Sequence, residues 1–141
     1  MTVAVHDLDC ETRAPQLARR WTAECLRAQL DAAASADGAA NGAVSGAVDD
    51  LIDDAVLCVS ELVTNAVHAG CSELRLELRV DQHAVRVAVL DNAPGRPTPR
   101  SAGRDERSGR GLRLVEAVAR RWGVTPGERG KSVWAEFGRP A

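Results

Sequence analysis

A strictly alternating segment constrains the fold of this 141-residue chain more than any other feature. Between residues 74 and 80, aliphatic and charged side chains alternate at every position, which predicts a strand with one buried face. A short turn at 81–83 leads into a second apolar run over 84–91, so the two segments are expected to pair as a hairpin. A sheet with one apolar face needs helices packed against that face.

Three helices are predicted to cover the sheet, because apolar side chains recur at helical spacing over residues 15–30, 48–68 and 111–122. Further short strands are expected at 124–126 and 133–137. The order of these elements predicts an α+β fold. We expect a two-layer α/β sandwich with three helices packed on one face of a mixed, largely antiparallel sheet.

The length allows one domain core and leaves no room for a second. This domain is expected to span residues 13–138, between an extended lead-in at 1–12 and a tail at 139–141. Residues 32–47 are small and interrupted by glycine, which predicts a flexible connection. Residues 92–110 contain several prolines and glycines, which predicts a long loop.

Charge balance and cysteine spacing exclude several function classes. With 18 basic and 20 acidic residues, the chain has no overall basic field, and we expect no direct nucleic-acid partner. No apolar run is long enough to cross a membrane, and the start of the chain lacks a signal-peptide pattern. The four cysteines are far apart and form no Cys-x-x-Cys pair, which favours reduced, mostly buried thiols and a cytoplasmic location.

A polar stripe on the second predicted helix is the first candidate for chemistry. Asp54, Glu61, Asn65 and His68 share one helix face, which is most simply the solvated side of the helix. Glu61 and Asn65, however, lie one turn apart among apolar or small residues. Together they could project into a pocket, where a carboxylate accepts a proton and an amide oxygen binds Mg²⁺.

Asp91 is the second candidate, because it continues the parity of the apolar positions in its strand. Its carboxylate is therefore expected to face the buried side of the sheet, where a charge is costly unless it is paired or hydrogen-bonded. Two interpretations remain open. Asp91 either forms the turn that precedes Asn92 and Pro94, or it contacts a ligand.

The segment that follows Asp91 is strongly basic. Residues 96–113 contain six arginines against Asp105 and Glu106, a balance that would attract an anionic ligand. The segment ends in Gly109-Arg110-Gly111 at the expected start of the third helix, where free N–H groups favour phosphate. The spacing fits neither a Walker loop nor a Rossmann unit.

In this order, three motifs resemble those of the gyrase/chaperone/histidine-kinase/mismatch-repair ATPase superfamily. They are Glu61-Leu-Val-Thr-Asn65-Ala, similar to its N box, and Asp91-Asn-Ala-Pro-Gly95 and Gly109-Arg-Gly111-Leu-Arg-Leu-Val, similar to its two glycine boxes. The resemblance covers roughly residues 13–138 and is strongest to the small anti-sigma-factor serine kinases. It implies a Bergerat-type ATP-binding fold with the 92–110 loop as an ATP lid.

The resemblance also implies a role for each matching position. Glu61 would be the catalytic general base and Asn65 the Mg²⁺ ligand, while Asp91 would accept a hydrogen bond from the adenine amino group. The remaining nucleotide-binding positions would be Gly95, Arg107, Gly109, Arg110, Gly111, Leu112 and Ser132. The chain departs from the family pattern at Ala93, in place of a glycine, and at Lys131, in place of a threonine.

The function implied by the resemblance is that of an ATP- and Mg²⁺-dependent protein serine/threonine kinase. Its partners would be a small anti-sigma-factor antagonist and a sigma factor that it sequesters. The alternative is a non-catalytic ATP-binding module that regulates a partner by contact. A detached histidine-kinase domain is less expected, because no histidine lies in an N-terminal helical hairpin. The apolar face around Leu17 and Trp21 would serve either a homodimer or packing on the chain's own sheet.

Overall fold

The expected hairpin forms the middle of a five-stranded sheet in the computed structural model, which describes residues 1–37, 42–94 and 106–140. The elements in chain order are β1 (Thr2–Leu8), α1 (Ala14–Asp37), α2 (Gly42–His68), β2 (Leu74–Val80), β3 (Ala84–Asp91), α3 (Glu106–Val118), β4 (Arg121–Pro126) and β5 (Lys131–Gly138).

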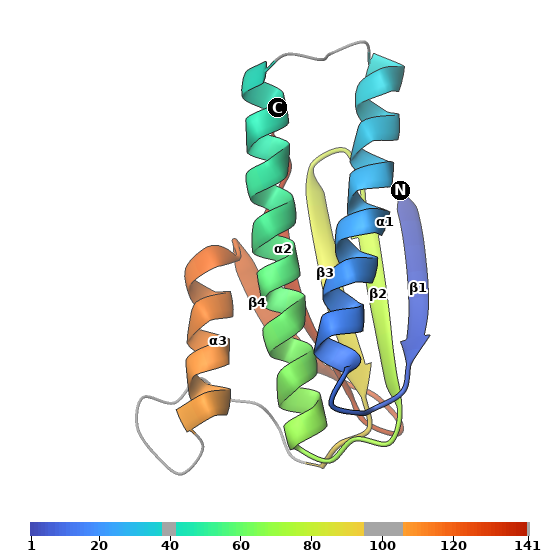
Figure 1. Ribbon diagram of the computed structural model, residues 1–141, viewed down its shortest axis with the longest axis vertical. Coiled ribbons are helices and arrows are strands. Elements are labelled where there is room, and N and C mark those ends of the chain that lie inside the picture. Colours follow the sequence, from blue (N-terminus) through green and yellow to red (C-terminus); the bar gives the residue numbers. More distant parts are fainter. Residues whose placement is uncertain (38–41, 95–105, 141) are drawn as a thin grey trace.

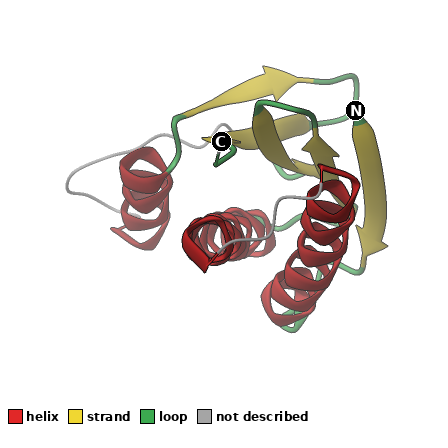
Figure 2. Ribbon diagram, turned by 90° about the horizontal axis from the view of Figure 1, so that it is seen from above, coloured by secondary structure: helices red, strands yellow, loops and turns green. Residues whose placement is uncertain are grey.

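The sheet has the strand order β1-β2-β3-β5-β4, and every neighbouring pair is antiparallel. All three helices lie on one face of it (Figures 1 and 2), and the other face carries none of the described helices. The expected α+β sandwich is therefore confirmed. The sheet, expected to be mixed, is antiparallel throughout the strands that the structure describes.

Alternation in the strands builds the core as the sequence predicts. In β2 and β3, every second side chain is buried beneath the helices, and its neighbours are more exposed. Apolar side chains of α1, α2 and α3 pack on this face. The largest fully buried apolar side chains are Leu26, Leu76, Leu78, Leu112, Val63, Val85, Val87, Val89 and Val115.

The first two helices are longer than predicted. α1 continues to Asp37 and α2 begins at Gly42, so most of the connection expected at 32–47 is helical, and 38–41 lie outside the described residues. Alanine, which dominates this segment, has the highest helix propensity of all residues and compensates for the nearby glycines. Local glycine content was therefore a poor guide to where these helices end.

The third helix is shifted toward the N-terminus relative to the prediction. It spans Glu106–Val118, and Trp122, expected in its last turn, lies in β4 instead. The expected lead-in at 1–12 contains β1, which pairs with β2 at the edge of the sheet. The part of the expected loop 92–110 from residue 106 onward is helical, while 95–105 lie outside the described residues.

The expectation of reduced cysteines is wrong for one pair. Cys10 and Cys71 form a disulfide with Cα atoms 6.0 Å apart, although 61 residues separate them in sequence. Cys25 and Cys58 are free thiols. Sequence spacing could not reveal the pairing, because the fold brings the turn before α1 next to the segment that follows α2.

The apolar face of α1 is used within the chain. The Trp21 ring stacks on the His6 ring of β1, with the ring centroids 5.3 Å apart. This is the packing on the chain's own sheet that the sequence offered as the alternative to a homodimer interface. In the described parts of the chain, no helix is both long and apolar enough to span a bilayer.

Candidate functional site

The two strongest candidates from the sequence meet at one end of the molecule. Figure 1 places the end of β3, which carries Asp91, at the same end as the last turns of α2, which carry Glu61 and Asn65. The first turn of α3 lies at this end as well. The end of β3, the end of α2 and the start of α3 are far apart in the sequence but lie at the same end of the molecule.

The end of α2 is fixed by a complete Schellman motif. Gly70, predicted to stop the helix, has a φ of 85°. Its N–H donates to Val67 O, and the N–H of Cys71 donates to Ala66 O. The helix therefore ends at a defined place, and the chain turns directly toward β2.

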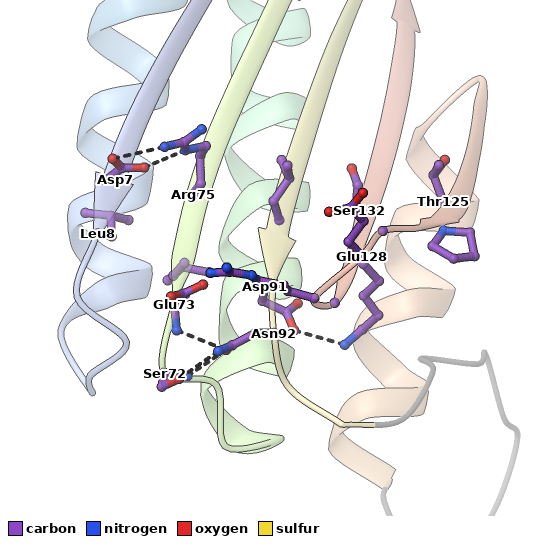
Figure 3. Close-up of a pocket in the computed structure, with 17 residues that line it drawn as sticks. Asp7, Leu8, Ser72, Glu73, Arg75, Asp91, Asn92, Thr125, Glu128 and Ser132 are labelled. Carbon is purple, nitrogen blue, oxygen red and sulfur yellow. Dashed lines mark hydrogen bonds and ion pairs between the residues drawn. The ribbon is translucent and has the colours of Figure 1, made fainter.

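Asn92 ties the end of β3 to the segment that follows α2. Its Oδ1 accepts hydrogen bonds from the backbone N–H groups of Ser72, at 2.8 Å, and Glu73, at 2.9 Å. Its Nδ2 donates to Ser72 Oγ at 2.7 Å. These three bonds, visible in Figure 3, fix the position of the neighbouring Asp91 relative to the end of α2.

Glu61 and Asn65 are half-buried on α2, as is Asp54, whereas His68 at the end of the stripe is exposed. The stripe is therefore not simply the solvated side of the helix. Burial raises the pKa of the Asp54 carboxyl, and the charges of Asp50 and Asp53 add to this effect. The stripe thus places two half-buried side chains with oxygen atoms, a carboxylate and an amide, one turn apart near the end of α2.

The buried Cys58 thiol lies beside this stripe. Burial, reinforced by the charges of Asp54 and Glu61, raises its pKa to about 12. A thiol with this pKa stays protonated and unreactive, so Cys58 belongs to the core rather than to the chemistry of the site.

The Asp91 side chain is 2% exposed, so the predicted burial of its carboxylate is confirmed. Its Oδ1 accepts a hydrogen bond from the N–H of Ala93 at 2.8 Å, which is the turn-forming role that the sequence left open. The same oxygen accepts a hydrogen bond from Lys131 Nζ at 2.9 Å. Asp91 is therefore a buried acceptor that already has two donors.

The sequence identified Lys131 as a departure from the family pattern, but it did not predict that Lys131 bonds to Asp91. Lys131 shares the parity of Val133, Ala135 and Phe137 in β5, whose side chains are buried on the helix face. Ser132, which was expected at the nucleotide, has the opposite parity and lies on the other face of the sheet. The alternation of β5 predicts which face of the sheet carries Lys131. Only the pairing of β5 with β3 places Lys131 opposite Asp91.

The remaining predicted site residues lie in α3 or outside the described residues. Arg107, Gly109, Arg110 and Gly111 lie within α3 rather than before it, because the helix begins at Glu106. Leu112 of the same helix is fully buried in the core. Gly95 lies outside the described residues.

A pocket of about 780 Å³ lies at the ends of the strands, and both Asp91 and Lys131 line it (Figure 3). The residues that line it come from the ends of β1, β2 and β3 and from the β4–β5 turn, and none comes from α2. Glu61 and Asn65 are therefore not part of this pocket. Among the described residues, no group of three or more His, Cys, Asp or Glu side chains is arranged to hold a metal ion.

A second charged cluster surrounds Glu136 on the helix-free face of the sheet. The Glu136 side chain is 8% exposed, and its carboxylate pairs with Arg121 at 2.6 Å, Arg120 at 3.0 Å and Arg86 at 3.4 Å. Hydrogen bonds from Arg121 and then Arg120 outweigh burial and hold the pKa of Glu136 at about 2. The cluster joins β3, β4 and β5 and acts in stability rather than at the Asp91 site.

Comparison with known proteins places the chain in a family. A family model described as the histidine kinase-like ATPase domain matches residues 11–137. No curated protein sequence matches the chain. Among solved structures, the RsbU and RsbW domains of Rv1364c from Mycobacterium tuberculosis are similar, with a TM-score of 0.58 and 22% identity.

The alignment with that structure covers 100% of this chain and 33% of the other, so this chain spans about a third of the relative's length. At this identity the similarity shows a shared fold. The family model extends over most of the chain and includes α2, the end of β3 and α3. The chain therefore belongs to the family of histidine kinase-like ATPase domains.

Proposed function

We propose that the chain is an ATP- and Mg²⁺-dependent protein serine/threonine kinase that acts on a small regulatory protein. The observation that carries this proposal is the placement of half-buried Glu61 and Asn65 one turn apart on α2, at the end of the molecule where β3 presents Asp91. A carboxylate, an amide oxygen and a buried acceptor are the groups that a phosphotransfer site on this fold requires.

The residues present fit Mg²⁺-ATP differently at the two ends of the site. At the phosphate end, Glu61 and Asn65 supply hard oxygen atoms, which suit Mg²⁺. At the base end, Asp91 is a buried acceptor suited to the amino group of adenine, but Lys131 covers its Oδ1. Lys131 would therefore have to move before Asp91 Oδ1 could accept a hydrogen bond from the base.

Each residue has a defined task in the proposed reaction. Bound Mg²⁺-ATP supplies the transferable phosphoryl group together with the cation that neutralises its charge. Asn65 would hold the metal through its side-chain oxygen. Glu61 would orient the acceptor hydroxyl and take its proton, and Asp91 would bind the base.

The proposed protein substrate is an anti-sigma-factor antagonist, and a sigma factor is the proposed second partner. The similar fold of a structure described as RsbU and RsbW domains supports a role in this kind of regulatory system. The proposed cellular location is the cytoplasm, and it rests on these proposed partners alone, because the Cys10–Cys71 disulfide removes the argument from reduced thiols.

The test is transfer of labelled phosphate from ATP to a candidate antagonist protein. Glu61→Gln should reduce transfer by at least about a hundredfold, because the general base is lost while the side-chain volume is kept. Asp53→Asn, at an exposed carboxylate on the same helix, is the matched control and should leave transfer unchanged. Equal transfer by wild type and Glu61→Gln would remove Glu61 from the mechanism.

A second candidate function is favoured by the Lys131–Asp91 pair. A chain whose base-binding acceptor is covered could regulate a partner by contact alone. In that case partner affinity would be equal with and without Mg²⁺-ATP, and no phosphate would be transferred. The kinase proposal requires transfer that depends on Glu61.

A further inference from the structure

Lys131 is held opposite Asp91 by the architecture of the sheet. The two residues are direct cross-strand partners of β5 and β3, and the alternation of both strands directs their side chains to the helix face. The preceding Gly130 packs so closely on β3 that an added Cβ would collide with Asp91 O and with Asn92 Cα. The start of β5 is thus fixed against the end of β3, and the position of Lys131 follows from this.

The contacts of Lys131 occupy one oxygen of the Asp91 carboxylate. Its Nζ donates to Asp91 Oδ1 at 2.9 Å and to Ala93 O at 3.2 Å, while the Ala93 N–H donates to the same Oδ1. The side chains of Asp91 and Lys131 are 2% and 11% exposed. A ligand that approaches this carboxylate therefore meets an ammonium group already bound to it.

We propose that Lys131 is an affinity- and specificity-determining residue that caps the base-binding carboxylate of this ATPase domain. The adenine amino group would compete with the Lys131 ammonium for this carboxylate, because Asp91 Oδ1 already accepts two hydrogen bonds. This inference rests on the proposed binding of nucleotide and names the residue that regulates it.

The cap is a strong competitor for two physical reasons. An ammonium forms a charge-assisted hydrogen bond with a carboxylate, whereas the amino group of a base is neutral and forms a weaker one. The ammonium is also tethered on the adjacent strand, so its effective concentration at Asp91 is high. The apparent affinity for an adenine nucleotide is reduced by the fraction of molecules in which the cap is open.

This inference opposes the expectation from charge alone. Removing a positive charge near the site should weaken the binding of an anionic nucleotide, whereas removing a cap should strengthen it. Lys131→Thr removes both the charge and the cap. Arg129→Thr removes a charge from an exposed residue in the neighbouring β4–β5 turn and leaves the cap in place, so it is the matched control.

The experiment measures the affinity of the full chain for Mg²⁺-ADP and Mg²⁺-IDP by calorimetry. IDP carries a carbonyl oxygen where ADP carries the amino group, so it cannot donate to Asp91. Lys131→Thr should bind ADP at least about tenfold more tightly than wild type, and its preference for ADP over IDP should rise by a similar factor. Arg129→Thr should bind ADP within about twofold of wild type, as expected for an exposed charge.

Three outcomes would contradict the proposal that Lys131 caps Asp91. The first is an unchanged or lower affinity of Lys131→Thr for ADP, and the second is a strong preference of wild type for ADP over IDP. The second requires no variant, so the inference stays testable even if Lys131→Thr fails to fold. The third is the absence of ADP binding by both wild type and a folded Lys131→Thr, which would also remove ATP from the proposed function.

The premise can be checked by amine labelling, because Lys131 is the single lysine and shares its chemistry only with the N-terminal amine. In the folded wild type, Lys131 should react at least about tenfold more slowly than in the urea-unfolded chain, because it is buried in an ion pair. Asp91→Asn should restore most of the reactivity. Rapid labelling of the folded wild type contradicts the cap, whereas a failure of phosphotransfer alone leaves it intact.

Discussion

Cys10, in the turn between β1 and α1, is joined to Cys71, the residue directly after the αL glycine that ends α2. The bond links the edge of the sheet to the segment that Asn92 clamps beside Asp91. A covalent tie therefore lies close to the segment that Asn92 holds beside Asp91.

Removal of this disulfide should lower the free energy of unfolding. For a loop that spans 61 residues, chain entropy predicts a loss of up to about 4 kcal/mol. Urea unfolding of wild type with and without reductant, and of the Cys10→Ser/Cys71→Ser double variant, measures the loss. Cys25→Ser is the control, and equal midpoints for the oxidised and reduced wild type would contradict the prediction.

The Glu136 cluster should make stability depend on acidic pH. Because the folded pKa of Glu136, about 2, lies below its ordinary value of 4.5, the cluster stabilises the chain fully above pH 4.5, and this contribution is lost as pH falls through 2. The expected contribution is about 1–3 kcal/mol, since Arg120 and Arg121 are more than half exposed. Glu136→Gln should flatten the pH dependence of the unfolding midpoint in this range. An identical pH profile in wild type and variant would show that the cluster contributes nothing.

The Asp91–Lys131 pair should show strong energetic coupling. Lys131→Met leaves a buried carboxylate whose one remaining partner among the described residues is the Ala93 N–H, so we expect a loss of about 3 kcal/mol or more. The Asp91→Asn/Lys131→Met double variant should lose less than the sum of the two single losses, since no charge stays buried. Arg129→Met should stay within about 0.5 kcal/mol of wild type. Additive losses in chemical denaturation would contradict the ion pair.

Substitution by alanine at two glycines should change the stability of the chain in opposite directions. Gly130→Ala places a Cβ against the backbone of Asp91 and Asn92, which cannot move aside, so the chain should lose more than about 2 kcal/mol of stability. Gly46→Ala, in α2 with no neighbour within 4 Å, should gain about 0.5–1 kcal/mol. Melting temperatures report both changes, and a tolerated Gly130→Ala would mean that β5 is free to shift.

The elements that sequence reasoning predicted best depend on local periodicity. The alternation of residues 74–80 and the apolar stripe of α2 each fixed an element and its buried face, and the parity of Asp91 predicted its burial. Each of these patterns is complete within one segment of the chain. The buried faces in the structure therefore agree with the faces predicted from each segment alone.

The elements that it missed depend on pairing between distant segments. Lys131 faces Asp91 only because β5 pairs with β3 across a separation of 40 residues, and Cys10 meets Cys71 across 61. Neither register is encoded in a local pattern. The alanine-rich ends of α1 and α2 were missed for another reason, since helix propensity there outweighs glycine.

The register between β3 and β5 has a consequence for how this site changes in evolution. A slip of one residue would turn Val133, Ala135 and Phe137 out of the core, so the core prevents Ser132 from taking the place of Lys131. The group that faces Asp91 can therefore change only by substitution. Lysine and threonine codons differ by one nucleotide, so a single point mutation would replace the ammonium beside Asp91 with a hydroxyl on an unchanged fold.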